Sequence, residues 1–205
     1  MVGGQLAIIG HRVRPYLTNV KTDATGQETT MYLSFHFRLS RLLVINTYWE
    51  PTGGSENSLL MRVQNSPPAT SAGLSGLHYL QTEICDKVMA FMVTSPEISN
   101  IVLMSDLNST RYRQERGGSS HPPLQKWMDE TGFTDPIGNH LAEKNTRLNT
   151  CGANGEQISR IDHCLCMLTS AAVTAYGVSQ SPIWVDITNH VPLLIKLKMP
   201  LTRKH

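Results

Sequence analysis

The segment that decides the fold runs from Ile101 to Asn108 and reads Ile-Val-Leu-Met-Ser-Asp-Leu-Asn. Its first four residues are apolar, and a short run of this kind predicts a buried strand. Serine, aspartate and asparagine follow directly, so polar side chains are expected where the strand ends. Loops at the ends of strands can project several such side chains into one cleft while the sheet holds them rigid.

Working outward, the apolar patterns on both sides of this segment predict more strands and two helices. Apolar residues that recur in steps of three and four predict a helix over residues 76–93, and a second helix is expected over 122–131. Clusters of proline, glycine and serine predict loops at 51–54 and 66–68. Runs that are alternating, or continuous and apolar, predict strands at 6–9, 31–37, 42–48, 101–104, 160–167, 172–178 and 192–198.

This order of elements favours an α/β (α+β) fold in which a two-sheet β-sandwich is flanked by helices. Helices alternate with strands in the first half, whereas strands follow one another in the second half. A doubly wound Rossmann sheet fits that order less well. No glycine-rich phosphate-binding loop of the GxGxxG or GxxxxGK type is present, so a nucleotide cofactor has no support.

Length and composition are those of one globular domain spanning residues 1–205, with 40% hydrophobic and 17% charged residues. The net charge of +2 is too small to argue for or against a nucleic-acid partner. No apolar run reaches the roughly 18 residues that cross a bilayer, and the first residues lack the features of a signal peptide. The four cysteines are expected to be small buried side chains, which indicates an intracellular protein, nuclear or cytoplasmic.

Four short motifs occur in order at predicted strand ends. They are Asn46 to Tyr48, Ser105 to Asn108, Ser159 to Asp162, and Asn189-His190-x-Pro192. Together they resemble the motifs of the endonuclease/exonuclease/phosphatase superfamily, in particular its retrotransposon and abasic-site endonuclease-like branch. The resemblance covers nearly the whole chain. It implies a deoxyribonuclease-like four-layer sandwich, Mg²⁺ as cofactor, and hydrolysis of phosphodiester bonds, with DNA as the substrate class.

The resemblance also implies roles for single residues. Asp106 matches the carboxylate that orients or deprotonates the attacking water, and Asn108 matches an amide that holds the phosphate or the nucleophile. Tyr48 and Asn46 match phosphate-binding positions. Turn residues, and a tyrosine packed at the edge of a sheet, are the alternative interpretations of these positions.

His190 matches the histidine that binds the scissile phosphate, and Asp162 matches the carboxylate that hydrogen-bonds it. A physical argument supports this pair independently of the resemblance. Asp162 lies at the start of an otherwise apolar strand, and a buried carboxylate needs a hydrogen-bond donor or a positive charge beside it. We therefore expect the two side chains to lie within hydrogen-bond reach.

Two departures from the family pattern bear on mechanism. The family's metal-binding glutamate precedes the segment that residues 3–9 match, so the chain is expected to correspond to the C-terminal two-thirds of the domain. Residues 27–29 repeat the letters Gln-Glu-Thr of that missing motif, but at a different place in the fold. Asn189 stands where the family usually has aspartate, a degenerate metal-site position without the negative charge that a hard cation prefers.

The sequence therefore predicts an endonuclease-like phosphodiesterase that is slow or inactive as this chain. Three alternatives stay open at this point. The chain could be a binding module that keeps the phosphate-facing half of the cleft. It could be closer to the lipid or inositol phosphatases of the same superfamily, or it could be a truncated product without a stable fold.

Overall fold

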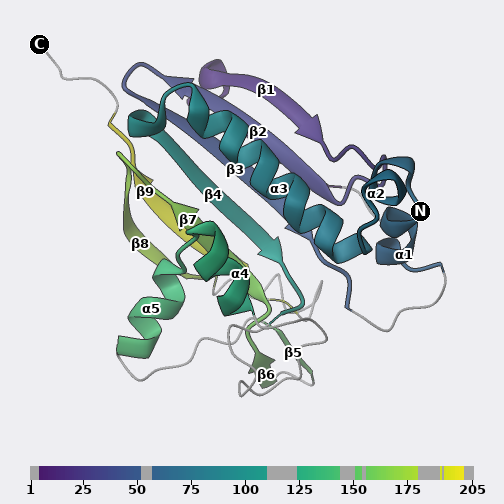
Figure 1. Ribbon diagram of the computed structural model, residues 1–205. Helices are drawn as coiled ribbons and strands as arrows, with labels where there is room; N and C mark the ends of the chain where they lie inside the picture. Colours follow the sequence, from purple (N-terminus) through teal and green to yellow (C-terminus); the bar gives the residue numbers. More distant parts are fainter. Residues whose placement is uncertain are drawn as a thin grey trace, which may run out of the picture.

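The computed structural model describes residues 5–51, 57–109, 124–143, 151–153, 156–179, 190 and 192–200 (Figure 1). None of the described helices is long and apolar enough to cross a membrane. The helices are η1 (Arg14–Tyr16), α1 (Leu59–Gln64), α2 (Pro67–Ala72), α3 (Gly76–Val93), η2 (Pro96–Ile98), α4 (Leu124–Thr131) and α5 (Pro136–Glu143). The strands are β1 (Leu17–Thr22), β2 (Thr30–Phe37), β3 (Ser40–Tyr48), β4 (Ser99–Asp106), β5 (Cys151–Ala153), β6 (Glu156–Ser159), β7 (Asp162–Met167), β8 (Ala172–Val178) and β9 (Leu193–Lys198).

Five strands form the larger sheet, in the order β1-β2-β3-β4-β7. β3 and β4 are parallel, and every other neighbouring pair in this sheet is antiparallel. A parallel pair needs a long crossover, and the segment that carries α1, α2 and α3 provides it. The strands expected at 31–37, 42–48 and 101–104 and the helix expected at 76–93 are confirmed.

The main core lies between this sheet and α3, which crosses one of its faces (Figure 1). Leu80, Ile84 and Val88 of α3 pack against alternate residues of β3 and β4, among them Ile45 and Leu103. α4 closes the same layer near the end of β3, where the Trp127 ring packs edge-on against Trp49, with 5.5 Å between the ring centroids.

The opposite face of the sheet packs against the smaller sheet of β8 and β9. Val102, Cys164 and Cys166 project from β4 and β7 toward Tyr176 and Ile195. Two sheets face to face with helices outside confirm the predicted β-sandwich. Cys164 and Cys166 are free and buried on one face, as their spacing of two predicts.

Residues 6–9 do not form the buried strand that their apolar run predicts. They lie outside every strand, and the side chains of Leu6 and Ile8 are 81% and 90% exposed. A short apolar run becomes a strand only where a neighbour satisfies its backbone groups, and no described strand pairs with this segment. The edge strand β1 lies further on instead, and its polar, exposed residues give little strand signal.

The proline-rich segment at 66–68, expected as a loop, begins the short helix α2. Pro67 and Pro68 occupy its first turn, where the missing backbone N–H groups have no intrahelical acceptor to lose. Gly73 ends the helix in the left-handed region at φ 67°, a conformation that suits glycine.

The start of α3 generates a stability prediction because Gly76 has no room for a side chain. A Cβ atom at this position would lie 2.2 Å from the backbone oxygen of Leu60 in α1. Gly76→Ala should therefore force α1 away from α3 and lower the free energy of unfolding by about 1–3 kcal/mol. Urea denaturation followed by circular dichroism measures the change.

Gly177→Ala is the matched control, since a Cβ atom there meets no heavy atom within 4 Å. It should change stability by less than about 0.5 kcal/mol. Equal unfolding midpoints for Gly76→Ala and the unmodified protein would contradict the tight α1–α3 contact.

Candidate active site

Three neighbouring strands bring polar side chains to one edge of the larger sheet. Tyr48 at the end of β3 is in register with Asp106 at the end of β4, and Asp106 is in register with Asp162 at the start of β7. Side chains of a strand alternate between the two faces of its sheet, so all three belong to the face that β8 and β9 cover. Two carboxylates therefore lie opposite each other at the end of an apolar layer.

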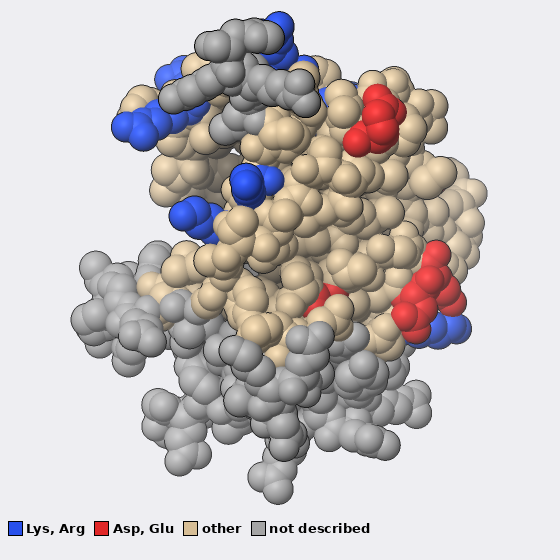
Figure 2. Space-filling model, turned by 90° about the vertical axis from the view of Figure 1, so that its left-hand side faces the viewer, with Lys and Arg blue, Asp and Glu red and all other residues tan. Residues whose placement is uncertain are grey.

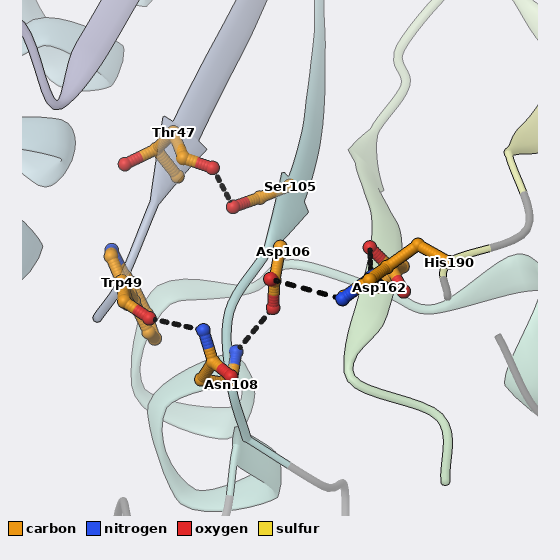
Figure 3. A network of polar contacts seen from close by, with 7 residues as sticks. All are labelled: Thr47, Trp49, Ser105, Asp106, Asn108, Asp162 and His190. Carbon is orange, nitrogen blue, oxygen red and sulfur yellow. Dashed lines mark hydrogen bonds and ion pairs between the residues drawn. The ribbon is translucent and has the colours of Figure 1, made fainter. Parts of the chain in front are cut away.

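His190 lies beside both carboxylates (Figure 3). Its Nδ1 atom is 3.0 Å and 3.1 Å from the two carboxylate oxygens of Asp162, so Nδ1–H donates to Asp162. Its Nε2 atom points to the other side, 4.0 Å from an oxygen of Asp106. The pairing of Asp162 with His190 that the sequence predicts is thus present, and the ring sits between two acids.

Asp106 is less acidic than an ordinary aspartate. Burial, together with the nearby charge of Asp162, raises the pKa of its carboxyl from 3.8 to about 6. The backbone N–H of Asn108 donates to Asp106 at 2.9 Å, and this bond, together with His190, opposes the rise. A carboxylate whose pKa lies near neutral pH can accept a proton and release it again.

Asn108 holds the turn after β4. Its backbone lies in the left-handed region at φ 44°, which asparagine tolerates better than most residues. Its side-chain Nδ2 donates to the backbone oxygen of Trp49 at 2.8 Å, which ties the end of β3 to this turn. Burial and the charges of Asp106 and Glu50 raise the pKa of Tyr48, whose hydroxyl hydrogen-bonds the Asn108 side chain. Tyr48 therefore keeps its proton and can donate it to an anion.

Asn46 lies in a cleft of about 210 Å³ that runs from Asp106 and Asp162 along the inside of β9. Its side-chain amide donates to the side chain of Gln5, which itself donates to the backbone oxygen of Thr29 at 3.2 Å. The structure thus brings Asn46 into the same cleft as the carboxylates and occupies its donor with a neighbouring side chain.

A buried ion pair holds the chain just before β7. No functional role is predicted for its two residues from the sequence. The Arg160 guanidinium donates two hydrogen bonds to Asp135, at 2.7 Å and 2.8 Å. Burial opposes ionisation of Asp135, but Arg160 outweighs it and lowers the pKa of that carboxyl. Asp135 also caps α5 by accepting from the backbone N–H of Gly138 at 2.9 Å. An arginine just before a buried strand was the available signal, since such a charge needs a counter-ion.

Asn189, the degenerate metal-site position, falls outside the described residues. Asp186, Arg111, Arg113 and Arg116 lie outside them too. His163, which follows Asp162, is buried and belongs to the opposite face of the sheet. Its Nε2 atom is 2.7 Å from the backbone oxygen of Ser109. This contact anchors the chain that leaves the Asp106 turn.

Asp106, Asp162 and His190 could hold a metal ion, because one ligand atom from each lies within 4.8 Å of the others. Their donor set suits a divalent cation in general better than Mg²⁺ in particular. Mg²⁺ prefers six oxygen ligands, whereas one of these three donors is an imidazole nitrogen. Asp162 is also engaged by His190, so Asp106 is the carboxylate best placed to meet a cation.

Comparison of the sequence with protein-family models and with curated proteins found no match. Comparison with solved structures found similar chains. An AP endonuclease of Leishmania major matches with TM-score 0.56 and 13% identity over 82% of this chain and 54% of that chain. An AP endonuclease of Archaeoglobus fulgidus matches with TM-score 0.55 and 15% identity over 89% of this chain and 72% of that chain.

The APE2 catalytic domain of Xenopus laevis matches with TM-score 0.53 and 17% identity over 85% of this chain and 60% of that chain. The chain thus spans about half the length of the Leishmania protein, at 54%. Sequence identities this low support a similarity of fold and nothing more. The larger sheet, its crossover helix and the second sheet give this chain a fold similar to that of these AP endonucleases.

Proposed function

We propose that this chain is a metal-assisted phosphodiesterase of the nuclease type, and that Asp106, His190 and Asp162 carry its chemistry. The arrangement of His190 between two carboxylates, at the strand ends of an AP endonuclease-like fold, supports this most directly. Hydrolysis of a phosphodiester needs an activated water and positive charge near the phosphoryl oxygens. The three side chains can supply both.

In this proposal Asp106 accepts a proton from the attacking water. Its pKa of about 6 leaves most of it ionised at neutral pH while keeping it a stronger base than an exposed aspartate. Asn108 keeps the carboxylate oriented through its backbone N–H. Tyr48 lies beside Asp106 in register and offers a hydroxyl proton to a phosphate oxygen.

His190 faces the reacting phosphate with Nε2 and is oriented by Asp162 through Nδ1. A carboxylate on one ring nitrogen fixes the tautomer and the orientation of the ring, so that the other nitrogen is held toward the phosphate. A divalent cation such as Mg²⁺, held by Asp106 with water and substrate oxygens, would add positive charge at the phosphoryl group. Asn189 and Asn46 stay candidates for positions near that phosphate.

A nucleic-acid substrate fits this proposal better than a lipid or inositol phosphate. The AP endonuclease-like neighbours support nuclease chemistry as the class. The net charge is only +2, but on the side drawn in Figure 2 several Lys and Arg side chains lie around a hollow in the upper left part, whereas most acidic groups lie to the right. Basic regions of this kind attract the phosphates of a nucleic-acid backbone.

A non-catalytic nucleic-acid-binding module is the second candidate. It is favoured by the poor match of the Asp106, Asp162 and His190 donors to Mg²⁺. The same acid–imidazole–acid arrangement would then orient a phosphate without cleaving it.

A sensitive plasmid-nicking assay separates the two candidates. With Mg²⁺ the chain should nick supercoiled plasmid slowly, several orders of magnitude below a complete metal site, because the metal's share of charge stabilisation is several kcal/mol. Mn²⁺, which accepts imidazole more readily, should give the higher rate. His190→Ala should remove what activity there is.

Nicking that His190→Ala leaves unchanged would overturn the catalytic proposal and favour the binding module. Fast Mg²⁺-dependent nicking that His190→Ala abolishes would show that another carboxylate, such as Glu50 or Asp186, completes the metal site. Circular dichroism of the variant checks that its fold is intact.

Asp106→Asn tests the electrostatics of the site without an activity measurement. Because burial raises the pKa of Asp106 to about 6, the folded protein loses stability as pH rises from 3.8 through that value. Asparagine keeps the acceptor for Asn108 but not the charge. The variant should be more stable by about 1–3 kcal/mol at about pH 7, and this gain should vanish near about pH 4.

Urea denaturation at both pH values measures the difference. Asp129→Asn is the control, since that carboxylate is exposed on α4. A stability gain that is the same at both pH values, or absent at the higher one, would contradict the destabilised carboxylate.

A further inference from the structure

A second groove lies on the other face of the larger sheet, away from Asp106 and His190. It has a volume of about 410 Å³ and is lined by residues of β1, β2, β3 and α3. Arg41 and Leu43 of β3 face this groove and α3, whereas Asn46 of the same strand faces the cleft under β9. The two sites therefore lie on opposite faces of one sheet.

Three cations line this groove. Lys21 comes from the edge strand β1, Arg41 from the start of β3, and Lys87 from α3 above them. Among the described residues, no carboxylate lies within 4.0 Å of any of the three; the ion pairs found there involve other side chains. The nearby acids on α3 are Glu83, which is buried and accepts from the backbone N–H of Ala24, and Asp86, which is exposed beside Lys87.

Arg41 is held in place before any ligand arrives. Its guanidinium stacks over the Phe91 ring at 4.3 Å and donates to the backbone oxygen of Phe91 at 3.1 Å. Its Nε atom donates to Nε2 of the exposed His36 at 3.2 Å, so the proton of the neutral imidazole resides on Nδ1. An arginine anchored in this way loses little conformational freedom when it binds an anion.

An unpaired buried hydroxyl is the second, independent observation. Tyr32 lines the groove and is only 4% exposed, and its hydroxyl has no hydrogen-bond partner among the residues that the structure describes. Burial, with the charges of Glu83 and Asp23, raises the pKa of Tyr32, so the hydroxyl keeps its proton. A buried donor without an acceptor costs free energy that a bound oxyanion would recover.

We propose that this groove binds the phosphate of a nucleic-acid strand at a site separate from Asp106 and His190. Three cations with no carboxylate within 4.0 Å among the described residues supply the charge, and the buried Tyr32 hydroxyl is a donor without a partner in the described part of the chain. The groove has room for more than a single ion, and its other walls combine polar residues such as Ser34 with apolar ones such as Leu43. The shared chemistry is a phosphate group, carried either by a strand or by a free nucleotide.

Fluorescence anisotropy with a short labelled oligothymidine, at low salt and with EDTA, tests the proposal on the full chain. Lys21→Gln combined with Lys87→Gln should weaken binding about ten-fold and reduce the salt dependence, by about 0.7 in the logarithmic slope for each lost phosphate contact. The control is Lys196→Gln combined with Lys198→Gln, the same charge change on exposed positions of β9, which should alter affinity less than about two-fold.

Tyr32→Phe distinguishes a ligand-binding hydroxyl from a structural one. It should leave the melting temperature unchanged or raise it, because it removes an unpaired buried donor, while weakening strand binding up to about five-fold. Displacement of the strand by adenosine monophosphate would assign the groove to a terminal phosphate, and its failure to displace would assign it to the diester backbone.

Several results would overturn the proposal. These are no binding of the strand, equal losses in the two lysine pairs, or a lower melting temperature with unchanged affinity in Tyr32→Phe. Stronger displacement by an acidic peptide than by nucleotides would assign the groove to a protein partner instead. None of these outcomes depends on the nicking activity.

Discussion

The register between β4 and β7 is the constraint on which the candidate site depends. It sets Asp106 directly opposite Asp162, so two acids share one end of an apolar layer. Like charges opposite each other in a sheet repel and are unfavourable. The His190 ring lies beside both carboxylates, where a positive charge on it would reduce their repulsion. A slip of one residue in this register would turn one carboxylate to the α3 face, and the two acids would no longer lie side by side. The buried pair of Arg160 with Asp135, just before β7, helps to hold that register.

The electrostatics of the site therefore lower the free energy of unfolding. Asp106 is buried enough for its pKa to rise to about 6, although Asn108 and His190 both favour its charged form. A sheet edge selected for stability alone would carry a neutral residue there. Groups held in unfavourable surroundings persist where the rest of the fold stabilises them, and they gather at sites of chemistry.

Much of this fold could be predicted from the sequence because its central elements have strong periodicities. The strands around Ile45 and Leu103 and the helical face of α3 are buried, so their side chains carry the pattern. The pairing of Asp162 with His190 was expected from the family resemblance, and the need of a carboxylate in an apolar strand for a partner agreed with it. The edge strand β1 and the exposed segment at residues 6–9 could not be predicted in this way. Whether such a segment forms a strand depends on the neighbouring strand it pairs with and not on its own pattern of apolar residues. The contact of Arg160 with Asp135 spans 25 residues, so the sequence indicates that Arg160 needs a counter-ion but not which residue provides it.

One strand, β3, contributes to both proposed sites. Its residues alternate between faces, so Arg41 belongs to the α3 side while Asn46 and Tyr48 belong to the β9 side. Ile45, fully buried, lies between them in the strand and packs toward α3. Sites that share no side chain and are separated by a packed layer are expected to respond to substitution independently. The two sites lie on opposite faces of the larger sheet. A single nucleic-acid strand that contacted both sites would therefore have to pass around the edge of the sheet. Independent contributions of Lys21 and His190 to binding would instead indicate two separate strands or segments.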